Sequence, residues 1–271
     1  MFDAHTHLQD SRLTAVFDEV VARAARAGIT GICSCGTAPG DWGATARLAC
    51  AAFPFTVVPG FGVHPWYAGH LPPDWLACLE EHLAAHPGAA VGEIGLDGVR
   101  GDVPPERQEE TLAMQLGLAV RLQRPVVTHG ARAWERLAEV LKPFARDLPG
   151  VMAHGFGGSS EQLRVFLGMG GVVSVSGSVC NPRAEKIREA ARRIPDDRLL
   201  VETDAPDLFP PGGVSAGFGR DGKPLNQPAN LARVLTELSA LRNVPPETLA
   251  VLTRANAQRF FYGHTGHDRR Q

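Results

Sequence analysis

The chain has 271 residues, of which 44% are hydrophobic and 21% are charged, and its formal net charge is −2. This length suits one (β/α)8 barrel of about 250 residues, and the composition supplies a sizeable core, which argues against global disorder. The charge shows no overall basic excess of the kind that indicates nucleic-acid binding, although a local basic rim could still meet phosphate.

Cysteine usage and the N-terminal sequence indicate a cytoplasmic protein. The five cysteines are an odd number, and neither a charged n-region nor an apolar h-region opens the chain, so we expect reduced thiols. Cys33 and Cys35 are not spaced as C-x2-C and no second pair follows, which disfavours a zinc site there. The sequence contains no run of 18 apolar residues, so no transmembrane helix is predicted.

Short apolar runs alternate with longer amphipathic stretches along the whole chain. Strands are predicted at 2–8, 31–36, 56–63, 90–96, 125–129, 150–154, 171–176 and 199–203, and helices at 12–27, 41–52, 74–86, 106–123, 132–147, 159–169, 184–194, 229–242 and 246–260. This alternation indicates a parallel sheet, and eight repeats favour its closure into a TIM barrel over an open doubly wound sheet.

No linker divides the chain, so we predict one barrel domain over residues 1–262. The Gly- and Pro-rich segment 205–228 is predicted to be a long loop after the eighth strand, and long loops in compact domains are often functional. The polar residues 263–271 are predicted to form a disordered tail.

Five of the ten histidines fall at the ends of predicted strands: His5, His7, His64, His129 and His154. One buried histidine is more often a satisfied core residue than a ligand. Five are hard to explain that way, because each would need its own buried partner. His5 and His7 are two apart on a strand and therefore share a face, with Asp3 on the same face one step deeper.

Two carboxylates occupy similar positions. Glu93 lies within an apolar strand, where a carboxylate is costly unless it is paired or bound to metal; a buried ion pair with an arginine is the alternative. Asp204 ends the eighth strand, and Glu202 lies on the same face, where it could orient a histidine ligand.

These polar residues together predict a metal site at the C-terminal mouth of the barrel, where parallel barrels place their catalytic groups. The predicted ligands are His5, His7, Glu93, His129, His154 and Asp204. Nitrogen and oxygen ligands suit Zn²⁺, Mn²⁺, Mg²⁺ or Fe²⁺, and six ligands are more than one tetrahedral ion uses, so we expect two divalent ions with Glu93 between them.

Other chemistries are less well supported by the sequence. It contains neither a G-x-S-x-G elbow nor a G-x-x-x-x-G-K-[ST] loop. The glycine-rich run from Gly155 to Gly158 could receive a phosphate on its backbone amides or could simply be a flexible barrel loop.

The polar motifs as a set resemble the TatD family of metal-dependent deoxyribonucleases, within the amidohydrolase-like barrels, over nearly the whole chain. The motifs are Asp3-Ala4-His5-Thr6-His7, Gly62-Val63-His64-Pro65, Gly92-Glu93-Ile94-Gly95-Leu96-Asp97, Pro125-Val126-Val127-Thr128-His129, His154-Gly155-Phe156, Glu202-Thr203-Asp204-Ala205-Pro206 and Asn226-Gln227-Pro228. The resemblance implies that His5 and His7 bind one metal and that His129 and His154 bind the other. It also implies that Glu93 bridges the two, that Asp204 completes the site, and that His64 contacts substrate or polarises the transition state.

The chain departs from the family pattern at three points. The arginine usual two residues after the histidine of strand five is absent, and Arg132 comes one place late; Gly98 replaces an aromatic residue and Gln227 an acidic one. The sequence therefore supports the metal chemistry more firmly than the substrate.

We expect a DNase-type phosphodiesterase that uses a metal-activated water on DNA, most simply single-stranded. The alternatives are a related barrel enzyme that hydrolyses a small ester, amide or phosphoester, and a non-enzymatic scaffold with a degenerate site. Asp204, His64 and Glu93 are the predicted catalytic residues, with Asp204 accepting the proton of the water. Phosphates are expected to meet His64, Arg132, Arg220 and Lys223.

Overall fold

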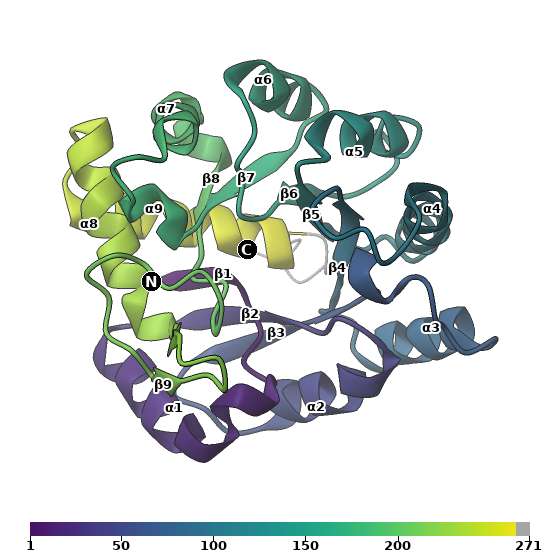
Figure 1. Cartoon of the computed structure of the whole chain (residues 1–271), viewed down its shortest axis with the longest axis horizontal. Coiled ribbons are helices and arrows are strands. Elements are labelled where there is room, and N and C mark those ends of the chain that lie inside the picture. The colour runs from purple at the N-terminus through teal and green to yellow at the C-terminus, as the bar shows by residue number, and fades with distance from the viewer. Residues whose placement is uncertain (264–271) are drawn as a thin grey trace, which may run out of the picture.

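The structure, a computed structural model, describes residues 1–263 and contains one closed barrel of eight parallel strands in the order β1 to β8 (Figure 1). The strands are β1 (Phe2–Thr6), β2 (Gly31–Cys35), β3 (Thr56–Phe61), β4 (Ala90–Asp97), β5 (Val126–Ala131), β6 (Val151–Ala153), β7 (Val172–Val175) and β8 (Leu199–Val201). The predicted TIM barrel is confirmed. The predicted polar tail lies outside the described residues except for Gly263.

Helices α1 to α8 follow the strands and form a ring around them, as the alternation predicted, whereas α9 crosses one end of the barrel (Figure 1). They are α1 (Phe17–Arg26), α2 (Pro39–Cys50), α3 (Trp75–Ala85), α4 (Pro105–Leu122), α5 (Trp134–Leu141), α6 (Ser160–Gly168), α7 (Glu185–Arg193), α8 (Leu231–Arg242) and α9 (Pro246–Tyr262). α5 ends six residues before the predicted boundary at 147. Within residues 1–263, none of the helices is long and apolar enough to cross a membrane.

The barrel closes between its first and last strands. The Asp204 N–H donates to the His5 carbonyl (3.0 Å) and the His7 N–H donates to the Ala205 carbonyl (2.7 Å). Two residues before His5 on β1, the buried Asp3 carboxylate accepts from the backbone N–H (2.9 Å) and the hydroxyl (2.5 Å) of Thr203. The open doubly wound sheet is thereby excluded.

Two strands depart from regular alternation, and each carries predicted ligands. The β1–β2 register shifts between Asp3 and Thr6. The β4–β5 register shifts between Val91 and Ile94, the residues on either side of Gly92 and Glu93. Bulges of this kind redirect side chains near functional sites. The prediction that Asp3 lies on the histidine face one step deeper is wrong, because the shift in β1 leaves its carboxylate bonded to Thr203.

The N-terminal end of the barrel is apolar. Phe2, Met152 and Leu200 belong to a buried cluster that α9 joins through Phe260 and Phe261. The Phe2 and Phe261 rings stack with centroids 5.5 Å apart, and α9 crosses the middle of the view in Figure 1. Burying apolar surface here supplies stability at a distance from the polar strand ends.

The segment predicted as a long loop after β8 contains a small hairpin, β9 (Gly217–Phe218) with β10 (Pro224–Leu225). Buried Asn226 holds the segment to the barrel, because its amide donates to the Thr203 carbonyl (2.7 Å) and the Leu208 carbonyl (3.3 Å). The segment is therefore packed against the strand end that carries Asp204.

Gly95 is required where β4 approaches β5. Its φ is +144°, and a Cβ at this position would overlap the His129 carbonyl oxygen.

We expect Gly95→Ala to lower the free energy of unfolding by about 2–4 kcal/mol, measured by urea denaturation. Gly117→Ala is the matched control, because nothing lies within 4 Å of its Cβ position in α4; it should stabilise the chain by about 1 kcal/mol. Equal stability of the two variants would contradict the packing argument.

Candidate metal centre

Four of the predicted ligands surround one point at the mouth of the barrel. His5 Nε2 and His7 Nε2 each lie 3.3 Å from Glu93 Oε2 and 3.4 Å from Asp204 Oδ1. Four donors around a tetrahedral ion with bonds of 2.0–2.1 Å lie roughly 3.3–3.4 Å apart. Each of these histidine–carboxylate contacts therefore has the spacing of two donors to a shared cation.

The other oxygen of the same carboxylate faces a second group. Glu93 Oε1 lies 2.9 Å from His129 Nδ1, 2.8 Å from His154 Nε2 and 3.4 Å from His64 Nε2. His129 Nδ1 and His154 Nε2 are 3.2 Å apart. The structure thus brings all six predicted ligands together, with one Glu93 oxygen in each group.

The far ring nitrogens of three histidines are held by oxygen acceptors. His7 Nδ1 lies 2.8 Å from the Cys35 carbonyl, His129 Nε2 lies 3.0 Å from Asp97 Oδ2, and His154 Nδ1 lies 3.3 Å from Glu202 Oε1. Such partners fix the tautomer and leave a lone pair on the nitrogen that faces the site, which is the usual arrangement of metal-bound histidine. The predicted position of Glu202 beside a histidine matches this geometry.

The inner ring nitrogens face the carboxylate oxygens. Without metal, the raised pKa values of His129 and His154 mean that protons compensate the charge of Glu93 Oε1, and a divalent cation among these atoms would take the place of those protons. The His5 ring is also available to a cation, because neither of its buried ring nitrogens has a hydrogen-bond partner within the described chain. Nitrogen and oxygen donors in this arrangement fit divalent metal ions.

The two carboxylates are ionised in this environment. Burial alone would raise the pKa of Glu93, but the neighbouring histidines, His154 above all, hold it well below its ordinary value. Burial likewise opposes the ionisation of Asp204, yet the adjacent imidazoles of His5 and His7 keep its pKa well below the usual range. Both side chains are therefore anionic near neutral pH.

The histidines differ in their affinity for protons. Burial lowers the pKa of His64 to about 4, so this ring is neutral near pH 7. Burial would also lower the pKa of His129, but hydrogen bonds with Asp97 and Glu93 raise it to about 9. The pKa values of His5 and His7 are raised despite their burial, His5 by the neighbouring Cys35 and Glu93 and His7 chiefly by hydrogen bonds with Asp204 and Glu93.

Comparison with known proteins identifies the family of this site. The family model described as "TatD related DNase" matches residues 2–262 of the chain. The chain belongs to the TatD related DNase family. It is therefore a metal-dependent hydrolase, and the resemblance of its motifs to this family is confirmed.

Two bacterial relatives match nearly the whole chain. The "3'-5' ssDNA/RNA exonuclease TatD" of Rahnella sp. (strain Y9602) is 35% identical over 266 residues, which cover 96% of this chain and 98% of the relative. The protein of the same name from Citrobacter rodentium (strain ICC168) is 36% identical over 271 residues, which cover 96% and 97%.

Solved structures of the family share the barrel. The chain matches the TatD homologue YJJV from Escherichia coli K12 with a TM-score of 0.87 and 33% identity, over 96% of this chain and 97% of that one. A TatD family hydrolase from Entamoeba histolytica shares the fold at 20% identity, with a TM-score of 0.85, over 97% of this chain and 98% of that one.

The predicted basic residues of this TatD family member are less clearly placed. Arg132 is exposed directly after β5, next to the strand end that carries His129, and its φ is +51°. Arg220 and Lys223 lie on the turn of the β9–β10 hairpin, where Lys223 is 82% exposed and pairs with Asp221 (3.1 Å). Among residues 1–263, the structure brings none of the three into contact with the six ligands.

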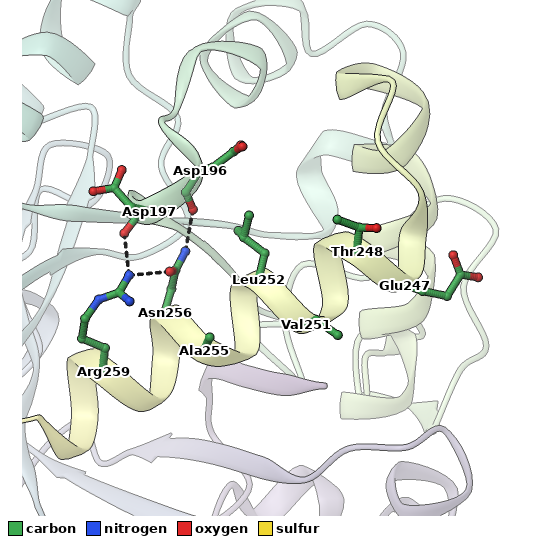
Figure 2. Close-up of a pocket in the computed structure, with 9 residues that line it drawn as sticks. All are labelled: Asp196, Asp197, Glu247, Thr248, Val251, Leu252, Ala255, Asn256 and Arg259. Atoms are coloured by element: carbon green, nitrogen blue, oxygen red, sulfur yellow. Dashed lines mark hydrogen bonds between the residues drawn. The ribbon is translucent and has the colours of Figure 1, made fainter. Parts of the chain in front are cut away.

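A surface pocket of about 670 Å³ lies at the other end of β8 and is separate from the metal centre. It is formed by α9 and the turn before β8, where Asn256 bonds the Asp196 carbonyl and Arg259 bonds the Asp197 carbonyl (Figure 2). Its lining contains no histidine. In TIM barrels this end serves stability rather than catalysis.

Sequence reasoning missed the role of Asp97, which the motif alone does not reveal. Its Oδ2 accepts from both His129 Nε2 (3.0 Å) and Trp66 Nε1 (2.8 Å), while its Oδ1 accepts from the backbone of Val99 and Arg100. Its position as the last residue of β4 was the available signal.

We expect Asp97→Asn to weaken the binding of divalent metal about 10- to 100-fold, because it removes the acceptor that fixes the His129 tautomer. Competition with a fluorescent chelator for Mn²⁺ or Zn²⁺ measures this affinity. Asp102→Asn is the control, because Asp102 lies in the same loop but pairs only with Arg100 at the surface. Equal affinity of the two variants would exclude the role given to Asp97.

Proposed function

We propose that the chain is a two-metal 3'–5' exonuclease of single-stranded DNA or RNA. The observation that carries the proposal is the Glu93 carboxylate, whose two oxygens face separate groups of ligands 2.8–3.3 Å away. The names of the full-length relatives supply the substrate class and the polarity. A scaffold has no requirement for six polar groups, four of them buried, that converge in this way.

The ligand set divides into two sites in this proposal. His5, His7 and Asp204 hold one ion and His129 and His154 hold the other, while Glu93 contributes to both. When bound, Mg²⁺, Mn²⁺ or Zn²⁺ ions would polarise the phosphoryl oxygen and lower the pKa of the attacking water. The remaining steps belong to the side chains of the chain itself.

Asp204 accepts the proton of the attacking water. Its low pKa keeps it ionised, and its Oδ1 faces His5 and His7 at the open end of the barrel. Its backbone φ of +56° lies in the left-handed region, which aspartate adopts more readily than most residues. A conformation of this kind is retained where the surrounding structure fixes it, as the hydrogen bond to His5 does here.

His64 donates a hydrogen bond to the substrate. Its Nδ1 accepts from the Trp66 backbone N–H (3.2 Å), so the neutral ring carries its proton on Nε2. That nitrogen faces the centre, 3.4 Å from Glu93 Oε1. In the proposed reaction it stabilises the charge that develops on a phosphoryl or leaving oxygen.

The general-base assignment predicts a separation of metal binding from catalysis. Asp204→Asn should keep most of its metal, because the amide oxygen can still coordinate, and should lower kcat on single-stranded DNA about 10²- to 10⁴-fold. Metal content by mass spectrometry and cleavage of a labelled oligonucleotide measure the two effects. Asp207→Asn, an exposed neighbour that pairs with Arg12, is the control. Turnover near the wild-type rate in fully loaded Asp204→Asn would exclude Asp204 as the base.

Arg132, Arg220 and Lys223 are proposed to meet the phosphates of the strand, since they lie on loops that follow β5 and β8. Their replacement by alanine should weaken binding and reduce the slope of log affinity against log salt by about 0.7 for each phosphate that is no longer neutralised. Fluorescence anisotropy at several salt concentrations measures the slope. Arg26, Lys142 and Arg146, also exposed, provide a control triple of equal charge. An unchanged slope in the first triple would assign the phosphates to other groups.

A further inference from the structure

The metal centre has an aromatic rim on one side that the proposed chemistry does not use. Trp66 and Tyr67 belong to the short 3-10 turn η2 (Pro65–Tyr67), which directly follows His64. They are 40% and 47% exposed, although aromatic side chains of this size usually bury most of their surface. The turn therefore displays two rings beside the catalytic histidine.

Exposed apolar side chains concentrate at this end of the described chain. Trp66, Tyr67 and Val99 follow β3 and β4, and Leu208, Val214 and Phe218 lie in the segment after β8; Met114, Val165 and Val251 are scattered on outer helices. Apolar surface gathered around a polar centre is typical of a ligand-binding site.

Trp66 is fixed in place rather than free to move. Its Nε1–H donates to Asp97 Oδ2, which also holds His129 Nε2. Its ring centroid lies 4.6 Å from that of His64 and 6.5 Å from that of His129. A group that stacks on Trp66 therefore lies within one nucleotide of a phosphate at the metal centre.

The rim also carries a guanidinium group, that of Arg100, which pairs with Asp102 on its own loop (2.8 Å). The Arg100 guanidinium lies 4.5 Å from the centroid of the Trp66 ring, and its side chain is half exposed. Asp97 Oδ1 accepts from the Arg100 backbone N–H (2.9 Å) and so sets the loop that carries this cation. A guanidinium stacked on an indole presents a planar, cationic surface.

We propose that Trp66, Tyr67 and Arg100 form a platform that stacks the base of the nucleotide next to the scissile phosphate. This proposal rests on the proposed nuclease function, which supplies a strand at the adjacent centre. Aromatic rings with a neighbouring cation suit nucleobases of any sequence, because every base has a π-face. A base can reach the platform only when it is unstacked, so the platform favours single strands over duplexes.

Removal of the base from the substrate tests the platform directly. The probes are a fluorescein-labelled dT10 with phosphorothioate linkages, which resists cleavage, and the same strand with tetrahydrofuran abasic residues at its two 3'-terminal positions. The metal-loaded wild type should bind the abasic strand about tenfold more weakly. Trp66→Ala and Tyr67→Ala should each weaken binding of dT10 several-fold and remove most of the difference between the two strands. Met114→Ala, an exposed apolar residue on α4, is the control and should keep that difference.

Kinetics on unmodified dT10 separate stacking from the alignment of His129. Tyr67→Ala should raise KM and leave kcat close to wild type, because this ring has no bond to Asp97. Trp66→Phe should still bind dT10 more tightly than the abasic strand, because it keeps a ring although it lacks the Nε1 donor. Equal binding of the two strands by the wild type, or an equal reduction on both strands in the variants, would overturn the platform.

The outcomes also distinguish this inference from the proposed function. Base-dependent binding without hydrolysis of dT10 would support the platform and overturn the nuclease proposal. Hydrolysis of dT10 without base-dependent binding would support the nuclease proposal and overturn the platform. Neither binding nor hydrolysis would overturn both.

Discussion

The structure of the site depends on the two-sided contact of one buried carboxylate. Glu93 is 2% exposed, and each of its oxygens faces a different set of imidazole nitrogens. A buried charge of this kind is costly unless it is compensated from every direction. The four ligand histidines and Asp204 can meet around it only because β1, β4, β5, β6 and β8 all end at the same mouth. The closed barrel is therefore what makes an otherwise unfavourable cluster of charges possible.

The seam between β1 and β8 couples closure of the barrel to the geometry of the ligands. The backbone bonds that join these strands involve His5, His7 and Asp204, the three residues grouped around Glu93 Oε2. Asp3 and Thr203 reinforce the seam one step deeper. Small changes in strand pairing here would move the ligands relative to one another, whereas the apolar end under α9 can supply stability without that constraint.

Regular alternation explains which parts of the site were predictable from sequence. In β5 and β6 the pattern runs without interruption, so the directions of His129 and His154 follow from their spacing. Asp204 lies beyond the end of β8 with a φ of +56°, so alternation alone does not fix its direction. In β1 and β4 the register shifts beside the ligands, and simple counting misplaced Asp3. The order of the strands followed from the eight repeats. The hydrogen-bond partners of the histidines could not be predicted in this way, because the Cys35 carbonyl and Asp97 lie on other strands and meet the rings only in the closed barrel.

The Asp97 carboxylate both fixes the backbone of the loop that follows β4 and orients two side chains at the site. One of its oxygens holds the backbone of Val99 and Arg100, and the other holds His129 and Trp66. Burial opposes the ionisation of Asp97, yet its hydrogen bonds to His129 and to these backbone N–H groups keep its pKa well below the ordinary value. The loop that carries Arg100 and the imidazole of His129 are thus both held by the Asp97 carboxylate. A contact that orders the rim would act on the same carboxylate that orients His129, so the rim and the metal centre are physically linked in this fold.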